Sequence, residues 1–299
     1  MLFLFAEAEQ AEEAAHHAPI IVRLVNQYFG EYAYKFEMNY TYPIWKKFLA
    51  KFGSTPEAVF GPYTPENAIP WYTIMFVIAC ILSVLIIWVM KGKLSEDEPG
   101  GGQQTLEAGV LAVRGMLEDI VGPHGLQYFP VVMTFAVLIL ISNLMGFFPL
   151  FMTPTAATSV TFALGLSSFL YYQYIGIKEN GIIKHLGHLA GPIWWIAPLI
   201  FFIESISNLI RPFTLGIRLF ANMFADEKVL ETIAHLVPGI TYWIVPVFLM
   251  PLSLFVCFIQ TFVFVLLSQL YISEVSHPPH EEHGHAETES VEHAAAVAA

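Results

Sequence analysis

The sequence carries little charge for its length. Only 13% of its 299 residues are Asp, Glu, Lys or Arg, whereas a soluble domain has about 25%. Hydrophobic residues account for 56%, and they form runs too long and too free of charge for the core helices of a soluble protein. This distribution predicts an all-α, polytopic membrane protein embedded in a lipid bilayer.

Basic residues, cysteines and phosphate-binding motifs are also scarce or absent. With 13 Lys and Arg against 25 Asp and Glu, the net charge is −12, which argues against nucleic acid as a partner. The two cysteines, Cys80 and Cys257, lie in apolar runs and cannot build a disulfide framework. No Walker-type loop occurs and no histidine lies at the centre of an apolar run, so we expect neither ATP binding nor a haem or other cofactor.

Five apolar runs are candidates for membrane helices. The first is uncharged and has tryptophan near both ends, as expected for a helix anchored at two membrane interfaces. Only a few residues separate the second run from the third, which predicts an antiparallel hairpin. The runs are 71–90, about 126–150, about 156–175, 192–233 and 242–271.

The last two runs are too long to cross a bilayer upright. As continuous helices they would measure about 60 Å and about 45 Å, against a hydrocarbon thickness of ~30 Å. We therefore expect two long, tilted helices, the first of them either strongly tilted or bent at Pro198 or Pro212.

One further helix is predicted to lie on a surface rather than to span. In 105–121, apolar residues recur at three- and four-residue spacing, while Glu107, Arg114 and Glu118 lie off that stripe. The segment is too charged to cross the bilayer, so we expect it at the bilayer interface or against a partner protein.

The polar ends divide the chain into three parts. We expect a polar extracytoplasmic segment at 1–69, a membrane domain at 70–273 and a disordered cytoplasmic tail at 274–299. The tail is rich in His, Glu and Ala. Its histidines also fit metal binding, but its acidic residues favour disorder. The orientation follows from basic residues in the short loops after the first and third runs, which are typical of cytoplasmic loops.

The 192–233 run carries polar side chains along one face. Read in steps of four and three residues, at ~100° per residue, this face stays within about 40° of one direction. Charged groups in apolar helices are costly and commonly mark an ion or proton path. The members of the face are Glu204, Asn208, Arg211, Leu215, Arg218 and Asn222.

Arg218 is the most informative member of this face. It stays charged in apolar surroundings, at a cost of about 2.5–3.5 kcal/mol near the helix centre. Glu204 lies about 21 Å away along a continuous helix and cannot pair with it. No other run has a charged residue at its centre, which points to a carboxylate on another protein. Arg211 either snorkels to an interface or joins the path, and Gln260 is a plausible neighbour of Arg218.

These residues carry a family resemblance. The segment SNLIRPFTLGIRLFANM at 207–223 closely resembles the signature of subunit a of F-type ATP synthases, whose LRLFGN core is IRLFAN here. SNLMGFFP at 142–149 and PTAATSVT at 154–161 look like further family motifs, and Gln260 fits the last helix. The resemblance covers roughly 71–273, and neither end of the chain shares in it.

The resemblance implies the stationary proton channel of the synthase, which is not an enzyme by itself. Protons would pass through two offset half-channels against a rotating ring of c subunits, in a bacterial inner membrane and beside peripheral-stalk b subunits. Arg218 matches the stator arginine that faces the ring carboxylate. The other implied proton-path residues are Glu204 at the cytoplasmic outlet, Asn222, Glu227 and Gln260 at the inlet, and Asn208 and Arg211.

Three positions depart from the family pattern. Ser253 stands where some members carry a histidine paired with the acid, Gly146 where some carry an aspartate, and Ala221 where the core has glycine. We therefore expect the inlet to use water or Asp226 in place of the histidine, with His235 as another candidate.

An ion-coupled secondary transporter with an intramembrane arginine site is the alternative function. Such transporters often consist of two related halves. The sequence has no internal repeat, which favours the synthase subunit.

Overall fold

The computed structural model describes residues 19–51, 56, 65, 68–92, 94–95, 99–148, 151–190, 195–236 and 241–276. In these ranges the chain is helical and contains no strand, as predicted. The helices are α2 (Ile20–Phe36), α3 (Tyr42–Ala50), α5 (Trp71–Lys91), α6 (Gly101–Val121), α7 (Phe129–Leu144), α8 (Thr158–Ala190), α9 (Ala197–Leu236) and α10 (Thr241–Ser276). A π-helical turn, Glu37–Thr41, joins α2 to α3. The short 3-10 turns are Pro123–Tyr128, Met145–Phe147 and Pro154–Ala156.

Four stretches of the described chain are long and apolar enough to cross a membrane. They are Trp71–Lys91, Pro123–Phe147, Pro198–Val229 and Leu249–Ser276. The third predicted span, 156–175, lies in α8 and is not among them, because its hydroxyl and tyrosine side chains lower the hydropathy. The prediction of a polytopic membrane protein is confirmed, and α8 is more polar than expected.

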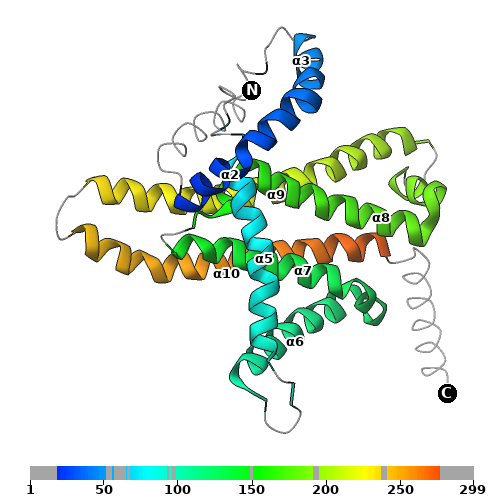
Figure 1. The fold of residues 1–299 in the computed structure, drawn as a ribbon. Helices are drawn as coiled ribbons and strands as arrows, with labels where there is room; N and C mark the ends of the chain where they lie inside the picture. The colour runs from blue at the N-terminus through cyan, green and yellow to red at the C-terminus, as the bar shows by residue number, and fades with distance from the viewer. Residues whose placement is uncertain are drawn as a thin grey trace.

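The two long helices are present and lie across α5. α9 has 40 residues and α10 has 36. Figure 1 shows α8, α9 and α10 running back and forth side by side, with α5 crossing them steeply. α9 includes both Pro198 and Pro212, so neither proline ends the helix.

Helices α8 and α9 meet at glycines. A Cβ atom on Gly165 would come within 2.6 Å of the Pro212 carbonyl oxygen. One on Gly216 would come within 3.2 Å of the Thr161 carbonyl oxygen. The two backbones are therefore in direct contact, as small residues allow between membrane helices.

Helix α6 covers part of α10. Leu117 and Val121 are fully buried and pack in one cluster with Val265 and Ile272 of α10. The Ser273 hydroxyl donates to the Ile120 carbonyl at 2.8 Å. The apolar stripe of this amphipathic helix thus packs against the chain's own last helix, whereas the sequence suggested a bilayer interface or another protein.

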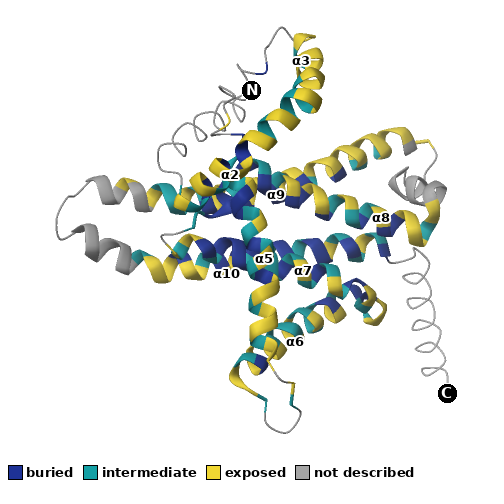
Figure 2. Cartoon of the chain, viewed as in Figure 1, coloured by how far each residue is buried: buried dark blue, intermediate teal, exposed yellow. Residues whose placement is uncertain are grey.

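Buried residues gather where the long helices cross, and the ends of α8, α9 and α10 are more exposed (Figure 2). The predicted hairpin partners pack less on each other than on the long helices: α7 packs chiefly on α10, and α8 packs on α9 and α10. At the far end of the fold, α10 continues through Glu274 to Ser276.

Residues 1–18 and 277–299 lie outside the described residues. The three-part division, the tail's disorder and the orientation therefore stay predictions.

We predict that Gly165→Ala destabilises the fold by about 1–3 kcal/mol, because the new methyl group must push the α8 and α9 backbones apart. The measurement is the temperature at which the purified protein loses its helical circular dichroism. Gly109→Ala on α6 is the matched control, because a Cβ there has no neighbour within 4 Å. Equal melting temperatures for the two variants would contradict the close contact.

Candidate functional site

The polar face of α9 is divided into two clusters. Because α9 is one continuous helix, the polar residues predicted for this face do share one side of it. Their partners differ, however: Glu204, Asn208 and Arg211 contact one set of side chains, and Asn222 contacts another. Arg218 lies between the two clusters.

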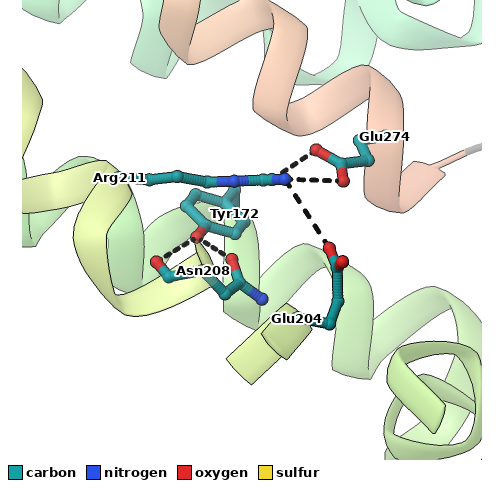
Figure 3. Close-up of polar contacts among 5 residues, drawn as sticks. All are labelled: Tyr172, Glu204, Asn208, Arg211 and Glu274. Carbon is teal, nitrogen blue, oxygen red and sulfur yellow. Dashed lines mark hydrogen bonds and ion pairs between the residues drawn. The ribbon is translucent and has the colours of Figure 1, made fainter. Parts of the chain in front are cut away.

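Arg211 is the centre of the first cluster, shown in Figure 3. Its guanidinium donates two hydrogen bonds to Glu274 of α10, one of them from Nη2 to Oε1 at 2.8 Å and the other from Nη1 to Oε2. Oε1 of Glu204 lies 3.8 Å from Nη2. The guanidinium carbon also lies 5.1 Å from the centre of the Tyr271 ring, in cation–π range.

Tyr172 of α8 closes the same cluster against Asn208. Its buried hydroxyl donates to the Asn208 side-chain oxygen and lies 3.5 Å from the Asn208 backbone carbonyl. Pro212 has no N–H, so it cannot supply the helical hydrogen bond that this carbonyl would otherwise accept. The Tyr172 hydroxyl therefore lies next to a backbone carbonyl that receives no helical N–H hydrogen bond.

Sequence reasoning missed Glu274, which it assigned to the tail. The residue lies fourteen positions after Gln260 in α10, within about 40° of the same helical direction. Extending the predicted last helix past Tyr271, along the face that carries Gln260, would have identified it. Arg211 thus pairs with a carboxylate of its own chain, whose side chain is 44% exposed.

The second cluster joins α9 to α10 at two points. Asn222 donates from its amide to the Gln260 side-chain oxygen at 2.5 Å. One turn further along α9, Asp226 accepts from the hydroxyl of Ser253 at 2.7 Å. Both α10 side chains in these bonds are buried. The structure therefore brings Asn222 and Gln260 together, and it pairs Ser253 with the acid that the sequence offered as a substitute.

The turn between α7 and α8 adds polar groups to this second cluster. Glu227 lies close to Thr153 of this turn, whose side chain is buried. The hydroxyl of Thr155 donates to the Asn143 side-chain oxygen at 2.6 Å. The Cys257 thiol contacts the Asn143 carbonyl at 3.7 Å. His235 has a side chain outside the described residues, so its predicted role is untested.

An apolar layer lies between the two clusters. Leu215 and Leu219 of α9 and Phe264 of α10 are fully buried or nearly so, and they pack in one cluster with Leu164 of α8. On α9 these leucines fall between Arg211 and Asn222. The polar side chains nearest to this layer are the buried Ser168 of α8 and Ser268 of α10, whose hydroxyls lie 2.9 Å apart, one turn from Tyr172 and Tyr271.

Arg218 is held on the exposed side of α9. In the part of the chain that the structure describes, the ion pairs are those of Arg211, one on α2 and one on α6, and none involves Arg218. The Tyr271 phenol lies near both arginines. The chain therefore displays a permanent cation that its own described carboxylates leave unneutralised.

Comparison with known proteins identifies the family. Residues 72–273 match the family described as "ATP synthase A chain". The chain belongs to this family. The predicted resemblance is confirmed over nearly the whole range from which it was drawn.

Several relatives carry the corresponding name. "ATP synthase subunit a 2" of Syntrophotalea carbinolica is 43% identical over 175 residues, which are 58% of this chain and 73% of that protein. "ATP synthase subunit a" of Geobacter sulfurreducens is 41% identical over 192 residues, covering 64% of this chain and 82% of the relative. That of Trichlorobacter lovleyi is 39% identical over 206 residues, covering 69% and 85%.

Membership in the ATP synthase A chain family decides between the two predicted functions. It supports a proton-translocating membrane subunit of the ATP synthase complex, which is not itself catalytic, over a secondary transporter. The bacterial relatives and the apolar helices identify a multi-pass protein of the bacterial inner membrane.

We predict that Tyr172→Phe lowers the stability of the subunit by about 1–3 kcal/mol, because it leaves the buried Asn208 side chain and carbonyl without their donor. The measurement is the temperature at which detergent-purified complex loses this subunit. Tyr174→Phe is the control, since that ring on the same helix is 60% exposed. A loss of equal size in both variants would contradict the Tyr172–Asn208 bond.

Proposed function

We propose that this chain is the stationary subunit of an ATP synthase in which two offset proton half-channels meet a rotating ring of c subunits at Arg218. The supporting observation is the position of Arg218: an exposed cation between two polar clusters that an apolar layer separates. The ring would supply the missing carboxylate. Peripheral-stalk b subunits are further proposed partners, and the N-terminus is proposed to lie outside and the tail in the cytoplasm.

The guanidinium performs two tasks in this mechanism. It stays charged at any physiological pH, so it attracts an ionised ring carboxylate and favours loss of a proton from a protonated one. It also repels protons from the direct route between the clusters. Protons therefore cross only on the ring, which has to rotate to carry them from one half-channel to the other.

Each polar cluster is proposed to serve one half-channel. Glu204, with Asn208 and Arg211, would form the cytoplasmic outlet. Glu227, with Asn222 and Gln260, would form the inlet. The Asp226–Ser253 pair supports the hypothesis that Asp226 replaces the histidine of other members, because it places an acid beside Ser253, the position of that histidine.

We predict that Arg218→Ala reduces proton-driven ATP synthesis to background while the complex still assembles, because the ring carboxylate loses its only fixed counter-charge. Synthesis is measured in inverted membrane vesicles with an imposed pH gradient. Arg114→Ala is the control, since Arg114 lies in an exposed pair with Glu118 at 3.0 Å. Normal synthesis by Arg218→Ala would refute the proposed role.

We predict that Glu227→Gln slows proton uptake several-fold, because the amide keeps the shape of the side chain and its contact with Thr153 but cannot carry a proton. Passive proton flux through the membrane sector, after removal of the catalytic part, measures this step. Glu107→Gln on α6 serves as the control. An unchanged flux in Glu227→Gln removes this residue from the path.

A further inference from the structure

The two carboxylates around Arg211 hold it unequally. Glu274 reaches it from α10 and accepts two hydrogen bonds from the two terminal nitrogens of the guanidinium. Glu204 belongs to α9 itself, two turns before Arg211, and comes no closer than 3.8 Å (Figure 3). A guanidinium binds a carboxylate best in the two-pronged arrangement, so Glu274 is its principal partner.

The cluster therefore has one negative charge in excess. Two carboxylates face a single guanidinium, and the neighbouring titratable groups are the phenols of Tyr172 from α8 and Tyr271 from α10. Because Glu274 is already neutralised by its close pair, the excess charge resides chiefly on Glu204. Its side chain is 39% exposed, so water can reach it.

We infer that Glu274 is a positioning residue of the proton path, which binds Arg211 and so prevents a tight ion pair between Arg211 and Glu204. Without a tight bond to the guanidinium, the Glu204 side chain stays open to water and free to pass a proton. This inference rests on the proposed function, since it assigns Glu204 to the cytoplasmic half-channel.

Competition for one guanidinium gives the physical reason. Without the carboxylate of Glu274, the nearest acid to Arg211 is Glu204, and a small movement of the long arginine side chain would close the gap. A close cation favours the ionised form of a carboxylate and lowers its pKa. Glu204 would then be bound to the guanidinium and less able to pass a proton.

The test is a double-mutant cycle on the intact complex. Glu274→Gln, Arg211→Gln and the double variant Arg211→Gln/Glu274→Gln are compared in inverted vesicles, where ATP-driven proton uptake from the medium is measured against pH. Glu274→Gln should lower uptake at neutral pH several-fold and move the alkaline limb of the profile about one pH unit lower. Arg211→Gln should move that limb higher, because it leaves two carboxylates facing each other.

The double variant gives the sharpest outcome. It leaves Glu204 as the only charged group of the three, so the cluster keeps the native net charge of one negative. Uptake should therefore recover from the level of Glu274→Gln toward the native level, with a native-like alkaline limb.

Two further variants serve as controls. Glu274→Asp retains the negative charge and should leave the alkaline limb in place. Glu118→Gln on α6 removes an exposed acid elsewhere in the subunit.

Two results would overturn the inference. If Glu274→Gln is as harmful in the Arg211→Gln background as in the native one, Glu274 carries protons itself. If it lowers only the amount of assembled complex and leaves the pH profile in place, Glu274 merely ties α9 to α10. The proposed function fails separately: if it is wrong, the Arg218→Ala variant shows normal proton-driven ATP synthesis.

Discussion

Everything in this structure depends on holding a permanent positive charge within an apolar helix. α9 carries two arginines on one face, two turns apart, and neutralises only one of them within the described chain. Arg211 lies between two carboxylates and beside an aromatic ring, so its charge is balanced internally. Arg218 faces outward, and none of the described carboxylates forms an ion pair with it. That contrast is the strongest structural argument for a partner that bears a carboxylate.

The length of the last two helices follows from the same constraint. Two polar clusters must lie on one helix, far enough apart for an apolar layer to fit between them. In α9 the layer is made by Leu215 and Leu219, which pack against Phe264 of α10. A helix just long enough to cross the bilayer upright, of about 20 residues, could not hold both clusters and the layer. A 40-residue helix that lies steeply across α5 has room for all three.

The sequence predicted the helices and their faces better than it predicted the packing. The one-sided polar face, the amphipathic α6 and the two long helices were all found from periodicity and run length. Glu274 was missed because the polar tail was taken to begin there, whereas the helix continues through it. The packing of α6 on α10 was not predicted, because an apolar stripe indicates that another surface covers it without identifying that surface.

Local pattern and tertiary contact thus decided different properties. Residue spacing and side-chain chemistry alone determined that the chain is a helical membrane protein and that one helix carries polar groups on one face. They also predicted a carboxylate partner for an arginine on that face. Only the packing of α9 on α8 and α10 determined that Arg211 pairs with Glu274, Asn222 with Gln260 and Asp226 with Ser253. The reason is that helical periodicity is a short-range property of the chain. The partner across a helix contact depends instead on the register between helices, which residues distant in the sequence establish together.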